Sequence, residues 1–106
     1  ELDTAYARGV ELLQKRKYAK ALYILNDYND RNTVVAHLSL DHNERAMELL
    51  ATMPKDAVTE YLRAIACSRL GRKEEGREHF LEACRLDGRM EYRGNLDPEI
   101  AELLKQ

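Results

Sequence analysis

The sequence predicts an all-α protein assembled from helical hairpins, and three observations carry this prediction. Apolar residues recur at steps of three and four along most of the chain, which places them on one face of an α-helix. Only two prolines and five glycines interrupt the 106 residues. The charged fraction of 34% and the apolar fraction of 44% suit a single helical domain of this length.

The clearest hairpin runs from Ala57 to Gly88. The apolar stripe of its first half is Val58, Tyr61, Leu62, Ile65, Ala66 and Leu70, and that of its second half is Gly76, Phe80, Ala83 and Cys84. Gly71 lies between the stripes, where a residue in the left-handed conformation ends a helix without a Cβ penalty. We therefore expect two helices that fold back on each other around Gly71 and Arg72.

Small and aromatic residues of this hairpin follow a known order. Counted from Ala57, they are Ala64, Gly71, Gly76, Phe80 and Ala83. At these positions the segment resembles the tetratricopeptide repeat, a helix-turn-helix unit of about 34 residues. It departs from the family at Glu60, Cys67 and Lys73, where aromatic residues are usual, and at Gly88, where proline is usual. The resemblance implies a right-handed α-α superhelix of three such hairpins plus a C-terminal capping helix.

The first unit, about residues 2–29, is predicted to be a second copy of this hairpin. A helix from Asp3 to Gln14, with Asp3 or Thr4 as N-cap, is followed by a turn at residues 15–17. The second helix is expected from Tyr18 to about Asn29. Gly9, Tyr18 and Ala21 occupy the small, aromatic and small positions of the repeat pattern.

The middle unit, about residues 31–53, is expected to be shortened. Its first helix is predicted over residues 33–40, and Asp41 with Glu44 resembles a capping box that starts the second helix. That helix should end near Pro54. The small residues that open each second helix, Ala21, Ala46 and Gly76, follow one another more closely than the family's repeat length allows.

The chain is expected to close with a capping helix over residues 97–105, after the unit at about 57–88 and an irregular connection from Arg89 to Asn95. Asp97 is the predicted N-cap, with Pro98 at the first helical position. Residues 90–100 also resemble the C-terminal ending of repeat proteins of the Bacteroidetes cell envelope, which implies a module of a larger envelope or periplasmic protein. Without that resemblance a cytoplasmic location stays open. The abrupt start inside a helical pattern predicts a part of a longer chain.

Residues for chemistry are sparse, and we expect no enzyme, no cofactor and no metal. His37 and His42 are five positions apart rather than four, and His79 lies at the edge of a stripe, so all three are interpreted as structural or surface histidines. Cys67 and Cys84 are interpreted as small core residues, with a disulfide between them left open.

Other partner classes are excluded by charge and hydropathy. The net charge of −2 and the mixing of acids with bases argue against nucleic acid, and the basic run Lys15, Arg16, Lys17 and Lys20 is typical of a solvated corner. No run of about 18 apolar residues could insert directly into a membrane.

The resemblance implies a concave groove, lined by the first helix of each hairpin, that receives a protein or peptide. Carried over by position, the groove residues are Tyr6, Val10, Leu13, Gln14, Arg31, Val35, Leu38, Ser39, Tyr61, Ile65, Ser68 and Arg69. Tyr6 and Tyr61 are expected to anchor a partner while their hydroxyls stay in water. The alternative is a structural role, in which these side chains pack between neighbouring hairpins.

We therefore expect a non-catalytic protein-protein interaction module, or scaffold. It would bind a peptide, a protein or a neighbouring domain of its own chain through an apolar groove. The alternative is a structural spacer or self-association domain, a homo-oligomer in which a second copy of the chain covers the apolar face.

Overall fold

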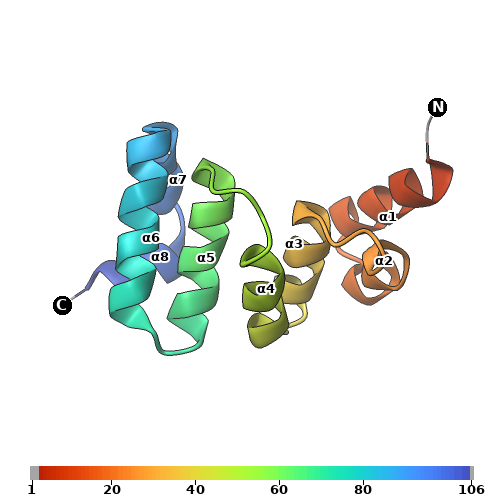
Figure 1. Cartoon of the computed structure of the whole chain (residues 1–106), viewed down its shortest axis with the longest axis horizontal. Coiled ribbons are helices and arrows are strands. Elements are labelled where there is room, and N and C mark those ends of the chain that lie inside the picture. The colour runs from red at the N-terminus through yellow and green to blue at the C-terminus, as the bar shows by residue number, and fades with distance from the viewer. Residues whose placement is uncertain (1–2, 106) are drawn as a thin grey trace. The chain divides into compact units, whose positions relative to one another are not determined.

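The computed structural model describes residues 3–105, which form eight α-helices and no β-strand (Figure 1). The helices are α1 (Thr4–Gln14), α2 (Tyr18–Leu25), α3 (Arg31–Ser39), α4 (Asn43–Leu50), α5 (Ala57–Arg69), α6 (Lys73–Leu86), α7 (Arg89–Asn95) and α8 (Pro98–Leu104). The prediction of an all-α protein is confirmed. Within the described residues, none of the helices has the length and hydropathy needed to cross a membrane.

The chain divides into two compact units, Glu1–Leu49 and Leu50–Gln106. The division falls at the end of α4, inside the middle hairpin of the predicted repeat. Each unit has its own apolar cluster. In the first unit it is Leu12, Ala21 and Leu25, and in the second it is Tyr61, Ala64, Ile65, Phe80, Ala83, Ile100 and Leu103.

Three turns share one backbone geometry. Arg16, Asp41 and Gly71 all have positive φ angles, of 61°, 60° and 79°. In each turn the next N–H donates to the carbonyl five positions earlier, Lys17 to Leu12, His42 to His37 and Arg72 to Cys67, at 2.8 to 2.9 Å. This bond and the left-handed residue before it define a Schellman ending. Each turn stands at the same offset before a small residue of the helix that follows, Ala21, Ala46 or Gly76, so the turns recur with the spacing of these small residues.

In the first unit α1 packs on α2 at very close range. A Cβ atom at Gly9 would lie 2.8 Å from Cδ2 of Leu25, so no larger residue fits without movement. The Asp3 side chain accepts a bond from the Tyr6 N–H, which confirms Asp3 as the N-cap of α1. Helix α3 then begins with Asp30 as N-cap, in a capping box with Thr33.

Several helix boundaries differ from the prediction. Helix α3 begins at Arg31 and not at Thr33, because Asp30 is its N-cap, and α4 ends at Leu50 and not near Pro54. Helix α2 ends at Leu25 and not near Asn29, because residues 26–28 form a turn and Asn29 adopts a positive φ of 53°. Asp41 is not the N-cap of α4. It has the left-handed conformation of the turn, and the first helical bond of α4 runs from the Ala46 N–H to the His42 carbonyl.

In the second unit the hairpin of α5 and α6 matches the prediction, and α8 packs on both of its helices. Asp97 accepts from the Glu99 N–H and Pro98 opens α8, as expected. The predicted irregular connection at residues 89–95 is wrong, because these residues form α7. Gly94 lies inside this short helix and lets it approach the core, since a Cβ there would lie 2.5 Å from Cζ of Phe80.

Candidate functional site

The predicted groove positions of the first unit keep part of their surface. Tyr6, Val10 and Leu13 on α1 are half-buried and pack on the apolar cluster of that unit, while Gln14 is exposed. On α3 the corresponding positions are mixed: Arg31 and Ser39 are exposed, Val35 is half-buried and Leu38 is buried.

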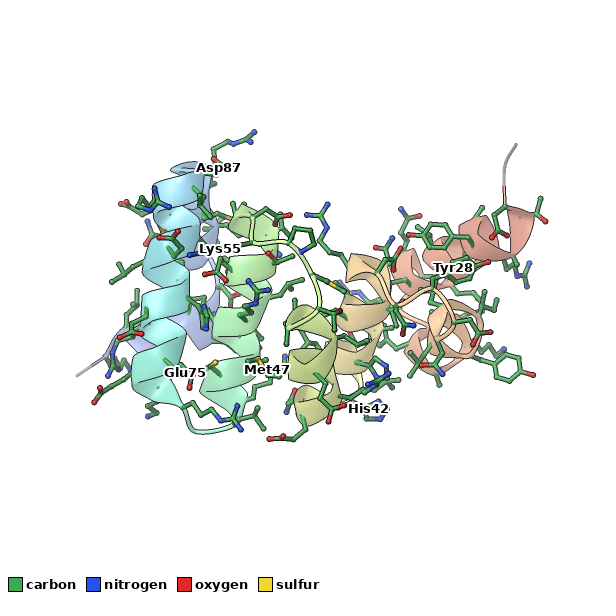
Figure 2. The ribbon with its side chains drawn as sticks, in the orientation of Figure 1. Tyr28, His42, Met47, Lys55, Glu75 and Asp87 are labelled. Carbon is green, nitrogen blue, oxygen red and sulfur yellow. The ribbon has the colours of Figure 1, made fainter. Side chains whose placement is uncertain are left out.

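The hydroxyl of Tyr6 is not in open water. It donates to Oδ2 of Asp30 at 2.5 Å and accepts from Nδ2 of Asn32 at 2.7 Å. The bond to the Asp30 carboxylate, followed by burial, raises the pKa of Tyr6. The ring lies against that of Tyr28, with centroids 4.8 Å apart, and Tyr28, which is labelled in Figure 2, donates in turn to Asp3. Tyr6 is therefore held in place by its own unit.

Tyr61 and Ile65 do not line an open groove, which corrects the expectation for these two residues. Their exposed fractions are 1% and 7%, and both belong to the core of the second unit. The Tyr61 hydroxyl donates to Oδ2 of Asp97 at 2.7 Å, and the guanidinium of Arg93 on α7 lies 4.3 Å from the ring centroid. Burial, then the bond to Asp97, raises the pKa of Tyr61 well above its usual range.

Arg69 is exposed but already engaged. Its Nε and Nη2 atoms donate to the two carboxylate oxygens of Glu99 on α8, at 2.9 and 2.8 Å. This bidentate pair is the strong geometry for arginine and a carboxylate. Ser68, the neighbouring groove position, is half-buried. Among the described residues, helices of the second unit itself therefore contact Tyr61, Ile65 and Arg69.

A buried carboxylate held by an arginine and a histidine lies in the second unit, and the sequence analysis did not predict it. The Glu60 side chain is 3% exposed, and its Oε2 accepts from Nη1 of Arg63 at 2.5 Å. Its Oε1 lies 3.2 Å from Nδ1 of His79 on α6. Arg63 also donates to the carbonyls of Leu50 and Met53, at 2.6 and 3.2 Å.

The pKa of Glu60 reflects this competition between burial and pairing. Burial raises the pKa of the carboxyl, while the hydrogen bonds from Arg63 and His79 lower it, and the net pKa lies below the ordinary value. Glu60 is therefore an ionised buried group, at a position where the tetratricopeptide pattern has a large aromatic residue. Only the missing aromatic marked it in the sequence.

His79 also belongs to a second cluster. One ligand atom each from Cys67, Glu75 and His79 lie within 4.8 Å of one another. Cys67 is buried on α5, while Glu75 and His79 are one turn apart on α6. Glu75, labelled in Figure 2, lies near the turn between the two helices. Burial, then the charge of Glu75, raises the pKa of the Cys67 thiol. The i, i+4 spacing of Glu75 and His79 was the available sequence signal.

The remaining histidines and cysteine form no comparable cluster within the described residues. His37 and His42 meet across the turn after α3, with their Nδ1 atoms 3.0 Å apart. Burial, then the neighbouring His42, lowers the pKa of His37. No third histidine, cysteine or carboxylate of residues 3–105 completes a ligand set with this pair. Cys67 and Cys84 are both free thiols.

Comparisons with known proteins give no relative for this chain. It matches no protein-family model, no curated protein and no solved structure. Support for a repeat therefore comes only from features of the chain itself, namely the equal offset of the three turns before a small residue.

Proposed function

We propose that this chain is a non-catalytic helical-repeat module of the tetratricopeptide type, and that α1 and α3 of its first unit bind a protein partner. We define the α1–α3 face as Tyr6, Val10, Leu13, Gln14, Arg31 and Val35. The partner segment is a short basic amphipathic helix. One comparison between the two units carries this proposal.

The comparison starts from matching contacts. Tyr6 and Tyr61 stand at the same distance before the left-handed turn residues Arg16 and Gly71, and each donates to an N-cap aspartate of a later helix, Asp30 of α3 or Asp97 of α8. In the second unit an additional helix, α7, lies between α6 and α8 and places Arg93 over the tyrosine ring. In the first unit residues 26–30, all of them described, connect α2 to α3 without a helix. Tyr28 of this connection lies against the Tyr6 ring, where Arg93 lies against that of Tyr61, and an external helix is proposed to bind beside it on α1 and α3.

The charges near Tyr6 favour a basic helix. The Tyr6 and Tyr28 hydroxyls donate to Asp30 and Asp3, and Asp27 is exposed beside Tyr28. A lysine or arginine of the partner would meet both aromatic rings and carboxylates there, as Arg93 meets the ring of Tyr61. The half-buried Val10, Leu13 and Val35 would take its apolar side chains.

The test uses a defined probe. A helix-stapled peptide with the sequence of residues 88–96 is titrated into the isotope-labelled chain, and backbone amide shifts are followed by NMR. We expect saturable shifts at Tyr6, Val10, Leu13 and Val35. Val10→Asp should weaken binding at least tenfold, whereas Tyr23→Ala, a change at an 88% exposed side chain, should leave it unchanged. Shifts elsewhere, or none at millimolar peptide, would contradict the proposal.

A self-association domain is the second candidate, favoured by exposed apolar side chains of the second unit. Leu81, Tyr92 and Leu96 are 63%, 70% and 69% exposed. Side chains of this kind on a surface are enriched where proteins meet. Sedimentation velocity over a concentration series separates the two functions. A dimer that a Tyr92→Ser and Leu96→Ser double variant dissociates would support self-association, and a monomer throughout would reject it.

A further inference from the structure

We propose that Cys67, Glu75 and His79 form a zinc site that connects α5 to α6. Three different ligand types converge here: a thiol from one helix and a carboxylate and an imidazole from the other, all within 4.8 Å. Glu75 and His79 are four positions apart on α6, so their side chains lie one above the other on one face. The proposal does not depend on the proposed function.

The distances are close to those that zinc requires. Tetrahedral Zn²⁺, with a bond to sulfur of about 2.3 Å and bonds to nitrogen and oxygen of about 2.0 Å, holds its ligand atoms roughly 3.3 to 3.6 Å apart. The ligand atoms therefore need to approach one another by at most about 1.5 Å. Glu75 is exposed and can change rotamer, while Cys67 is fixed in the core.

A second, independent observation is the way His79 is held. Its Nδ1 lies 3.2 Å from Oε1 of the buried Glu60, and Arg63 holds the other oxygen of that carboxylate. A carboxylate on one imidazole nitrogen fixes the ring and leaves the other nitrogen for a metal, so the proposal assigns Nε2 of His79 as the ligand atom. This carboxylate-histidine arrangement is the usual support of a zinc-binding histidine, and sequence spacing does not reveal it.

The ligand set selects the metal. Thiolate and imidazole suit Zn²⁺ and disfavour Mg²⁺ and Ca²⁺, which prefer oxygen ligands. On binding, the Cys67 thiol gives its proton to solvent and the sulfur forms the bond to the metal. Glu75 also lines an open surface depression with Gly71, Arg72 and Glu78, so this ligand is reached from solvent. A solvent molecule is then the fourth ligand.

The close approach of the two helices places Cys67 at the site. A Cβ on Gly76 would lie 3.3 Å from Cβ of Cys67, so the absence of a side chain at Gly76 brings the Glu75–His79 turn next to the thiol. Gly76 is the small residue expected at this position of the repeat pattern. Its lack of a side chain also sets the distance between Cys67 and the two ligands on α6.

The experiment uses cobalt as a spectroscopic probe on the full chain after chelation of metals. Stoichiometric Co²⁺ should give one thiolate-to-cobalt charge-transfer band and the visible bands of tetrahedral cobalt, both lost when Zn²⁺ is added. Cys67→Ala should abolish the charge-transfer band, and Cys84→Ala, the matched control, should keep it. Glu75→Gln should weaken Co²⁺ binding by at least tenfold.

Two readouts keep the test independent of folding. Circular dichroism checks that each variant is helical, and Glu75→Gln replaces an exposed side chain, so it should fold even if Cys67→Ala does not. Zn²⁺ should also raise the melting temperature of the wild-type chain and not that of Glu75→Gln. The proposal is overturned if Co²⁺ gives no thiolate band in the wild-type chain, or if Cys67→Ala or Glu75→Gln binds as tightly as wild type.

Discussion

Replacing Glu60 by leucine should destabilise the second unit by about 3 kcal/mol. Leucine keeps most of the volume but removes the carboxylate that faces Arg63 and His79. Breaking a buried ion pair by removing one partner costs about 3 to 5 kcal/mol, because a buried charge is left uncompensated. The lower end of this range applies, because Arg63 is 12% exposed and still donates hydrogen bonds to the carbonyls of Leu50 and Met53.

Thermal and urea denaturation followed by far-UV circular dichroism measure this loss. For a domain of fewer than about 100 residues each kcal/mol lowers the melting temperature by about 4 to 8 °C, so the expected drop exceeds about 12 °C. The double variant Glu60→Leu/Arg63→Met should recover part of the loss, because no charge then remains unpaired. Glu78→Gln, an exposed carboxylate on α6, is the matched control and should change little.

The same carboxylate predicts a pH dependence with a definite sign. The folded-state pKa of Glu60 lies below its unfolded value, so its contribution to stability is complete above the unfolded pKa of about 4.5. The contribution is lost as the pH falls through the lower folded-state pKa. Glu60→Gln should therefore flatten the acid limb of a stability-against-pH curve more than Glu78→Gln does.

A melting temperature for Glu60→Leu within about 2 °C of wild type would refute this reasoning, since it corresponds to less than about 0.5 kcal/mol. It would mean that the Glu60 carboxylate is not the counter-charge of Arg63 in solution. An acid limb identical in Glu60→Gln and Glu78→Gln would lead to the same conclusion.

Three further predictions concern the hairpins. Gly9→Leu should cost about 1 to 3 kcal/mol in urea denaturation, because its Cβ would overlap Leu25, and an unchanged midpoint would contradict the α1–α2 packing. Arg16→Gly should raise the melting temperature of the first unit, by relieving up to about 1 kcal/mol of left-handed strain, and a lower value would count against the turn geometry. Tyr61→Phe should cost about 1 to 2 kcal/mol, because the Asp97 carboxylate loses a partly buried donor, and full stability would show that this bond is not formed.

The hairpin pattern was readable because it depends on local spacing and on small residues. Gly71 was predicted as a left-handed turn residue, and the structure confirms it at φ 79°. Arg16 and Asp41 take the same conformation without being glycine, so composition alone did not identify them. Asp41 was instead interpreted as an N-cap, since aspartate is favoured both at caps and in left-handed turns. An aspartate at this position is therefore compatible with two backbone conformations, and the sequence alone does not distinguish them.

Residue Gly94 shows why α7 was missed. A glycine followed by Asn95 is typical of a loop, and helix propensity alone disfavours glycine by about 1 kcal/mol. The structure places Gly94 against the ring of Phe80, which is distant in sequence, so only the packed core reveals why a glycine stands inside a helix.

The candidate sites were the least predictable part for the same reason. Tyr61 and Ile65 were expected to line an open groove, because the resemblance places the first helix of each hairpin along that groove. His79 was interpreted as an ordinary histidine, because Glu60 and Cys67 lie on the preceding helix, far from it along the chain. Contacts between helices set all these environments, and a one-dimensional pattern does not contain them.

The two tyrosine contacts differ in the segment that separates each tyrosine from its aspartate. Tyr6 donates to the N-cap aspartate of α3, whereas Tyr61 donates to that of α8, which lies further along the chain from its tyrosine. The longer segment in the second unit contains α7, and the tyrosine-aspartate contact is present in both units. Helix α7 covers part of the second unit's core, because Arg93 stacks on the Tyr61 ring and Gly94 packs on Phe80. The short connection from α2 to α3 contains no such helix among its described residues, and for this reason we propose that a partner binds the first unit.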